Sequence, residues 1–254
     1  MKPTRLFGLI GNPLAHSFSK NHFEEKFRSE KITDSEYREF PLSEISLLPE
    51  LIASEPNLVG LNVTIPYKQE VMNFMDEVDD VANDIGAVNT IVITRDKDDE
   101  KAVSLKGFNT DVKGFEHSLV PLLNAEHTKA LVLGSGGGAR AIIFVLKKLG
   151  IEYQVVSREP TGGRSIGYDK LNQDLMETHS IIINSTPVGM EPNTEAAPDI
   201  PYELLNSSHL LYDLIYNPEE TEFLHKGRLA GATTKNGLDM LKIQAEKSWD
   251  IWNS

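Results

Sequence analysis

The chain has 254 residues, of which 40% are hydrophobic and 25% charged, and its formal net charge is -13. This length allows one large folded domain or two modest ones, and the composition is that of a globular rather than a disordered protein. The negative charge argues against nucleic acid or an anionic membrane surface as a partner. Because cysteine is absent, disulfides, thiolate metal sites and a cysteine nucleophile are excluded.

The N-terminal region predicts a strand followed by a polar helix entrance. A strand is expected at residues 6–11, and Ser17 and Ser19 then stand at the start of a helix over residues 20–31. One serine can cap the helix while the other is solvated, or both hydroxyls can bind a carboxylate beside the helix N–H groups. A second strand at 37–40 and a helix over residues 43–54 carry no obvious chemistry.

A lysine follows the next buried strand, which is predicted at residues 58–65. Pro66 suits the first position of a helix, and Lys68 would then lie in the first turn of that helix. The helix dipole disfavours a cation there, so the ammonium group should lose its proton more easily. The alternative is a surface lysine whose charged end reaches into water.

Two polar residues accompany the following pair of strands. Asn89 lies early in a strand predicted at residues 86–93, where a buried amide is either a structural hydrogen-bonding group or one that recognises a hydroxyl. After a charged turn, a return strand is expected at 104–108. Asp111 is then well placed as the N-cap of a helix over residues 112–123.

A glycine-rich turn lies near the middle of the chain. It follows an apolar strand at 130–133, and Gly134, Gly136 and Ala139 match the G-x-G-x-x-G/A pattern. Helical spacing then continues to Gly150, a typical C-terminal stop. Such glycines allow a tight turn and the close approach of a pyrophosphate to a helix N-terminus. The pattern therefore favours dinucleotide binding.

The strand at 153–156 ends at the position where this type of fold recognises the adenosine ribose. Ser157 and Arg158 stand there, and an arginine would pair with the phosphate of NADP, although Glu159 weakens this inference.

Two further strands, at 181–184 and 210–214, are joined by a proline-containing loop expected to cover the cofactor. A final helix, residues 237–252, is expected to leave the nucleotide domain and pack on the first domain.

Several polar and glycine-containing motifs occur in a fixed order along the chain. They are Gly11-Asn12-Pro13 with Ser17 and Ser19, Asn62-Val63-Thr64-Ile65-Pro66-Tyr67-Lys68, Ala87-Val88-Asn89-Thr90, Asn109-Thr110-Asp111, Gly134 with Gly136 and Gly137, Asn184-Ser185-Thr186-Pro187 with Gly189 and Met190, Tyr212-Asp213 with Tyr216, and Asn236-Gly237 with Met240, Leu241 and Gln244. In this order the motifs resemble those of the shikimate dehydrogenase family over nearly the whole chain.

The resemblance implies reversible, NADPH-dependent reduction of 3-dehydroshikimate to shikimate, in the route to chorismate and the aromatic amino acids. It implies Lys68 as acid/base and Asp111 as its catalytic partner, flanking the reacting oxygen. The implied substrate-binding residues are Ser17, Ser19, Thr64, Asn89, Asp111, Tyr216 and Gln244. The implied cofactor-binding residues are Gly134, Ser135, Gly136, Gly137, Gly138, Ser157, Arg158, Leu214 and Gly237. No metal is implied.

The chain also departs from the family pattern. The N-R-T cofactor signature is reduced to Ser157-Arg158-Glu159, so Arg164 is a candidate substitute and an NAD-using quinate/shikimate dehydrogenase is an alternative. A non-catalytic dinucleotide-binding regulatory relative is a second alternative. Asp80 corresponds to an acidic position near the nicotinamide, but a helix-surface carboxylate is the simpler interpretation.

We therefore expect two α/β domains with the active site in the cleft between them. Residues 1–110 with 238–254 form the substrate-binding and catalytic domain, and residues 111–237 form an NADP-binding, Rossmann-like domain. The expected partners are small molecules, without nucleic acid or membrane, and the expected form is a monomer or homodimer in the cytoplasm. No apolar run is long enough to span a bilayer, and the N-terminus does not resemble a secretory leader.

Overall fold

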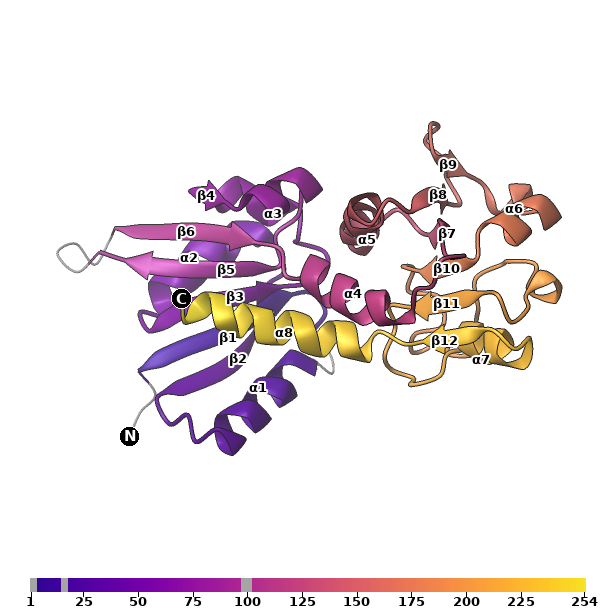
Figure 1. Ribbon diagram of the computed structural model, residues 1–254. Helices are drawn as coiled ribbons and strands as arrows, with labels where there is room; N and C mark the ends of the chain where they lie inside the picture. Colours follow the sequence, from indigo (N-terminus) through magenta and orange to yellow (C-terminus); the bar gives the residue numbers. More distant parts are fainter. Residues whose placement is uncertain (1–3, 15–17, 97–101) are drawn as a thin grey trace. The chain divides into compact units, whose positions relative to one another are not determined.

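The computed structural model describes residues 4–14, 18–96 and 102–254 (Figure 1). The chain divides into two units, Met1–Thr110 with Gln244–Ser254, and Asp111–Ile243. Each unit contains its own sheet and its own buried core, which confirms the expected α/β class with two domains. No helix within the described ranges is long and apolar enough to cross a membrane.

The first unit is built on a mixed sheet with the strand order β2-β1-β3-β5-β6-β4. Its strands are β1 (Arg5–Gly11), β2 (Ser35–Pro41), β3 (Leu58–Val63), β4 (Glu77–Val78), β5 (Thr90–Arg95) and β6 (Val103–Phe108). Its helical elements are α1 (Phe18–Ser29), η1 (Ile45–Leu47), α2 (Leu48–Ser54), η2 (Glu70–Phe74), α3 (Asp80–Ile85) and the greater part of α8 (Leu238–Trp252). Strand β5 runs antiparallel to both of its neighbours, β3 and β6.

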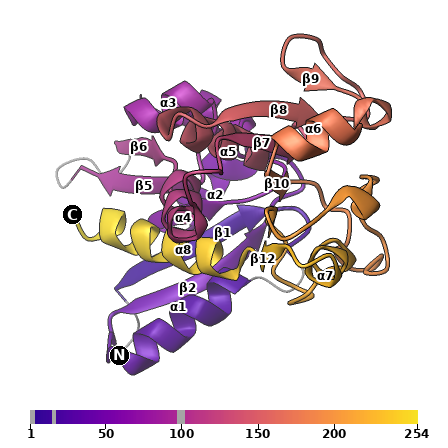
Figure 2. The ribbon, with the colours of Figure 1, turned by 45° about the vertical axis from the view of Figure 1, so that its right-hand side comes forward.

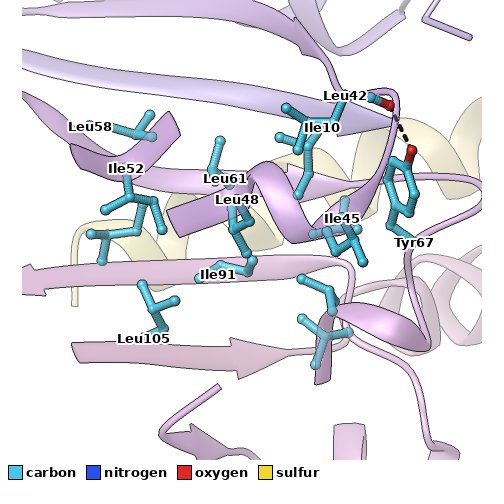
Figure 3. Packing of buried hydrophobic residues seen from close by; sticks show 14 of the residues in the cluster. Ile10, Leu42, Ile45, Leu48, Ile52, Leu58, Leu61, Tyr67, Ile91 and Leu105 are labelled. Carbon is cyan, nitrogen blue, oxygen red and sulfur yellow. Dashed lines mark hydrogen bonds between the residues drawn. The ribbon is translucent and has the colours of Figure 1, made fainter. Parts of the chain in front are cut away.

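Alternation along β1 explains why both faces of this sheet are covered. Leu6 and Ile10 belong to a core cluster that includes residues of α2, as Figure 3 shows for Ile10. Phe7 and Leu9 belong to a second cluster, with aromatic residues of α1 and with Trp252 of α8. Because successive side chains of a strand point to opposite faces, one short sequence supplies both cores. The predicted packing of the final helix on the first unit is confirmed.

Three predictions about local structure in the first half of the chain are wrong in detail. The helix expected from Pro66 is absent: residues 64–69 form no helix, and the 3-10 helix η2 begins only at Glu70. The segment expected as one helix over 43–54 is divided into η1 and α2. Strand β5 begins at Thr90, so Asn89 precedes the strand rather than belonging to it.

The second unit contains a fully parallel sheet with the order β12-β11-β10-β7-β8-β9. Its strands are β7 (Lys129–Leu133), β8 (Glu152–Val156), β9 (Ser165–Ile166), β10 (Ile181–Asn184), β11 (Leu210–Asp213) and β12 (Thr233–Lys235). Its helical elements, several of which Figure 2 shows, are α4 (Asp111–Leu119), η3 (Val120–Leu122), α5 (Gly137–Lys148), η4 (Tyr168–Lys170), α6 (Gln173–Thr178), η5 (Tyr202–Leu204) and α7 (Glu222–Leu229).

This strand order identifies where a ligand of the second unit should bind. Counted from β7, the order is 3-2-1-4-5-6 in reverse, which is the strand order of the Rossmann fold. The connections change direction between β7 and β10, and doubly wound sheets bind ligands outside the carboxyl ends of the strands at that point. The glycine turn that follows β7 lies at this position.

Candidate functional site

Several of the predicted substrate-site residues lie at one edge of the sheet of the first unit. The strand register aligns Ile10 with Val63, Asn62 with Thr90, and Thr90 with Phe108. Strands β1, β3 and β6 therefore end where the antiparallel β5 begins. The segments that leave this edge carry Thr64, Lys68, Asn89 and Asn109-Thr110, and Asp111 follows in the chain as the first residue of the second unit.

Asn89 has a fixed orientation within a buried hydrogen-bond network. The backbone N–H of Thr110 donates to Asn89 Oδ1 at 2.7 Å, and Asn89 Nδ2 donates to Thr110 Oγ1 at 3.0 Å and to Gln244 Oε1 at 3.4 Å. A backbone N–H can only donate, so this contact determines which side of the amide holds the oxygen. All three side chains are less than 9% exposed. The predicted hydroxyl-recognising residues Asn89 and Gln244 are thus brought together.

Lys68 is held through its main chain beside this network. Its carbonyl accepts the N–H of Val88 at 2.7 Å, and the adjacent Tyr67 is anchored by its hydroxyl, which donates to the carbonyl of Leu42 at 2.6 Å (Figure 3). The Lys68 side chain is half-buried. Because η2 starts two residues later, Lys68 does not lie in a first helical turn, and the helix-dipole argument made for it is wrong.

Of the two serines predicted at the entrance of α1, Ser17 lies outside the described residues. Ser19 lies in α1 and is 8% exposed. Its hydroxyl is hydrogen-bonded to Tyr37, whose own hydroxyl donates to Asn62 Oδ1 at 2.8 Å. Burial raises the pKa of Tyr37 far above its ordinary value, so this phenol stays neutral. Tyr37 was not singled out from the sequence.

In the second unit, the glycine turn leaves main chain open at the start of α5. Gly134 has φ 102°, and a Cβ there would lie 2.9 Å from both Ser185 Oγ and Thr186 Cγ2. A Cβ at Gly136 or Gly137 would meet no atom within 4 Å, so the backbone borders open space at the N-terminus of α5. Ser135 beside them is exposed. Backbone N–H groups at such a terminus suit a diphosphate.

Three other predicted cofactor residues, Gly138, Leu214 and Gly237, are packed closely together. A Cβ at Gly138 would lie 3.1 Å from Leu214 Cδ2, and a Cβ at Gly237 would overlap the Leu214 carbonyl oxygen. The N–H of Gly237 donates to the carbonyl of Ile215 at 3.1 Å. Gly237 is therefore needed where the segment after β12 passes the segment after β11.

Ser157 and Arg158 lie directly after β8, as expected for ribose recognition. Ser157 is half-buried and Arg158 is exposed. Arg164 is also exposed, but its guanidinium lies 5.1 Å from the centre of the Tyr153 ring. Cation–π stacking thus occupies the guanidinium of Arg164, and Arg158 remains the candidate for binding a ribose phosphate.

The remaining predicted residues are placed as follows. Asp111 is the first residue of α4 and is 6% exposed, so it is helical rather than a preceding cap. Tyr216 is half-buried, three residues after the end of β11. Asp80 is the first residue of α3 and is exposed, in line with the interpretation as a surface carboxylate.

Throughout the described chain, no group of three or more His, Cys, Asp or Glu side chains could hold a metal ion.

The sequence analysis did not single out Asp213, although the residue belongs to a quoted motif. Its side chain is 0% exposed, and burial raises its pKa to about 6 despite hydrogen bonds from Thr221, Ile215 and Asn184. Those hydrogen bonds have donor–acceptor distances of 2.6, 3.0 and 3.0 Å, respectively. In the sequence, the feature that could have identified Asp213 is a carboxyl group at the end of an apolar strand.

This buried carboxyl predicts a measurable dependence of stability on pH. Its folded pKa of about 6 exceeds the ordinary value of 3.8, so between these pH values the folded chain holds more protons than the unfolded chain. The ionised group therefore destabilises the fold above pH 6, and this destabilisation disappears below pH 4. We expect the free energy of unfolding of the wild type, relative to Asp213→Asn, to fall by about 2 kcal/mol between pH 4.5 and 7. Denaturant titrations of both proteins test this, and parallel pH profiles would contradict it.

Comparison with known proteins gives consistent matches. A family model described as the shikimate dehydrogenase substrate binding domain matches residues 9–91. A shikimate dehydrogenase (NADP(+)) of Methanococcus maripaludis is 37% identical over 264 residues, which cover 98% of this chain and 92% of that protein.

Solved structures match over the same extent. The shikimate 5-dehydrogenase of Thermus thermophilus, in complex with NADP(H) and shikimate, has a TM-score of 0.83 and 30% identity, covering 98% of this chain and 93% of that one. A quinate dehydrogenase of Corynebacterium glutamicum, in complex with NAD, has a TM-score of 0.84 and 27% identity with the same coverage.

Proposed function

Because the chain belongs to the shikimate dehydrogenase family, we propose that it catalyses the reversible, NADP-dependent interconversion of shikimate and 3-dehydroshikimate. It is an oxidoreductase that acts on a CH–OH group, in the biosynthesis of chorismate and the aromatic amino acids. The observation that carries this proposal is the combination of one sheet edge rich in oriented amides with a separate Rossmann sheet that carries a glycine turn.

Lys68 is the acid/base in this proposal, and Asp111 is its partner. When a ring carbonyl is reduced, negative charge develops on its oxygen, and a nearby ammonium can donate a proton to that oxygen. In the oxidative direction the neutral amine accepts the hydroxyl proton. The main-chain bond from Val88 supports this role, because it restricts the position from which the lysine side chain extends.

The other polar residues recognise the substrate. Ser17 and Ser19 bind the carboxylate together with Tyr216, and Thr64, Asn89, Asp111 and Gln244 orient the ring hydroxyls. The network supports this for Asn89 and Gln244, because the Thr110 N–H fixes the amide of Asn89, which in turn donates to Gln244 Oε1. The NH₂ group of a glutamine is a type of donor suited to a hydroxyl oxygen.

NADPH, when bound, supplies the hydride. The residues of the second unit fit this cofactor, because Gly136 and Gly137 border open space and α5 begins there. Gly134, Ser135 and Gly138 complete the turn, Leu214 lies against Gly138, and Gly237 packs on the main chain of Leu214. Ser157 and Arg158 bind the ribose phosphate.

Arg158 makes cofactor preference a direct test. We expect kcat/KM to be at least tenfold higher with NADPH than with NADH, a difference of about 1.4 kcal/mol, because only NADPH carries a phosphate for the guanidinium. Arg158→Gln should reduce this ratio toward unity, whereas Arg164→Gln should leave it nearly unchanged. Equal use of both cofactors by the wild type would favour the NAD-using quinate/shikimate alternative.

The function itself is tested by a spectrophotometric assay with shikimate, or with quinate, and each oxidised cofactor. Reduction of NADP+ with shikimate is the expected result. The absence of turnover with every pair would favour the non-catalytic relative. We further propose a cytoplasmic monomer or homodimer whose partners are small molecules, and size-exclusion chromatography with light scattering measures the oligomeric state.

A further inference from the structure

The network around Asp213 joins two loops at the carboxyl edge of the second sheet. Asn184, which donates to Asp213 Oδ1, is the last residue of β10, and its own Oδ1 accepts the N–H of Thr186 at 3.0 Å and the Thr186 hydroxyl at 2.6 Å. Ser185 between them donates to the carbonyl of Leu133 through N–H at 2.9 Å and through Oγ at 2.6 Å. The loop after β10 is thereby fixed against the end of β7.

The same carboxylate fixes the segment after β11. The N–H of Ile215 donates to Asp213 Oδ1, and the Thr221 hydroxyl donates to Oδ2. Leu214 lies between these anchor points, and its N–H donates to the carbonyl of Asn184 at 3.0 Å. Its side chain is the one that lies against Gly138.

Both loops border the glycine turn, but the carboxylate that joins them does not. Ser185 and Thr186 lie against Gly134, and Leu214 lies against Gly138. Asp213 is 0% exposed, and both of its oxygens accept hydrogen bonds from protein donors. A group buried in this way influences a ligand only through the residues that it holds.

We propose that Asp213 is a positioning residue for the nicotinamide dinucleotide. It holds the loops after β10 and β11 in one arrangement, so that Ser185, Thr186 and Leu214 are already positioned around the glycine turn before the cofactor binds. Preorganised contacts of this kind raise affinity because less ordering is required on binding. The inference rests on the proposed function only in assigning NADPH as the ligand.

A merely structural carboxylate would behave differently. Its loss would change the stability of the protein and leave the affinity of the folded fraction for NADPH unchanged. A positioning residue changes that affinity in protein that remains folded. Binding must therefore be measured directly, in addition to turnover.

Asp213→Asn is the informative variant, because it keeps the side-chain shape and removes the acceptor from Oδ2. Tyr212→Phe is its matched control: Tyr212 is the preceding residue of β11, is also 0% exposed, and loses a single hydrogen bond of 2.7 Å to Ser118 Oγ. Successive residues of a strand face opposite sides of the sheet, so the control disturbs the face away from the Asp213 network.

NADPH is titrated into each protein and the dissociation constant is read from the cofactor fluorescence, with circular dichroism to verify folding. We expect Asp213→Asn to raise this constant about tenfold and to change KM for shikimate less than twofold. Tyr212→Phe should change neither by more than twofold. A wild-type dissociation constant in folded Asp213→Asn would overturn the proposal.

Thr221→Val keeps the proposal testable if Asp213→Asn does not fold. It removes the hydroxyl that donates to Oδ2 and that also accepts the N–H of Leu224 at 3.4 Å as the N-cap contact of α7, so folding is verified by circular dichroism here too. A several-fold increase in the NADPH dissociation constant is expected. Wild-type affinity in that variant would equally contradict the proposal. If the wild type itself binds no NADPH, the proposed function fails as well, so the two failures are distinguishable.

Discussion

Lys68→Ala is expected to lower kcat for shikimate oxidation by about a thousandfold while KM for shikimate changes no more than a few-fold. Loss of a positioned acid/base costs this much, about 4 kcal/mol, because the reacting oxygen loses the group proposed to exchange its proton. In the proposed site, ground-state binding is assigned to the serine hydroxyls and to the amides of Asn89 and Gln244, which the substitution leaves in place. Steady-state kinetics at saturating NADP+ measure both constants.

Lys106→Ala is the matched control for that experiment. Lys106 belongs to the same unit and pairs with Glu77 at 2.9 Å on the surface, where both side chains are well exposed. Its removal deletes a positive charge without affecting the proposed site, so both kinetic constants should remain close to those of the wild type. If Lys68→Ala retained near-normal kcat, Lys68 would have no part in the chemistry. A large rise in KM alone would make it a binding residue.

Sequence patterns located most strands because the interior of each sheet is apolar. The runs around residues 58–63 and 130–133 are buried on both faces, and a buried strand appears in a sequence as a continuous apolar run. Strands β4 and β9 contain only two residues each, and no periodicity can be recognised over that length. They exist because a neighbouring strand pairs with them.

The error at Pro66 has a different cause. A proline followed by polar residues is compatible with a first helical turn, and the local sequence does not distinguish that turn from an irregular one. The observed conformation depends on Tyr67 bonding to Leu42 and on Val88 bonding to the carbonyl of Lys68. These contacts join segments 25 and about 20 residues apart, so tertiary structure determined what the local pattern left open.

The candidate residues were predicted better than their environments. Asn89 was identified as an amide that needs partners, but its partner Gln244 is 155 residues away in the chain. Residue types and motif order can indicate such chemistry, whereas the orientation of an amide can be assigned only when the positions of its hydrogen-bond partners are known. For the same reason, Tyr37 and Asp213 emerged only from the structure.

Gly237→Ala is the second substitution with a large expected effect. An alanine Cβ would overlap the carbonyl oxygen of Leu214 and lie 2.6 Å from its carbonyl carbon, and neither main-chain atom can rotate away. The segment after β11 must therefore shift, at a cost of about 3 kcal/mol in the free energy of unfolding. Because Leu214 lies against Gly138, NADPH affinity should fall by at least tenfold as well.

Gly137→Ala separates these two consequences. A Cβ at that position meets no atom within 4 Å, and alanine is favoured over glycine within a helix, so the free energy of unfolding without cofactor should be unchanged or slightly higher. The added methyl group occupies the space proposed for the phosphates, so NADPH affinity should still fall. Denaturant titrations without cofactor and NADPH fluorescence titrations measure the two effects. If Gly137→Ala bound NADPH as the wild type does, the phosphates would not lie at this turn, and the proposed cofactor site would be wrong whatever the result for Gly237→Ala.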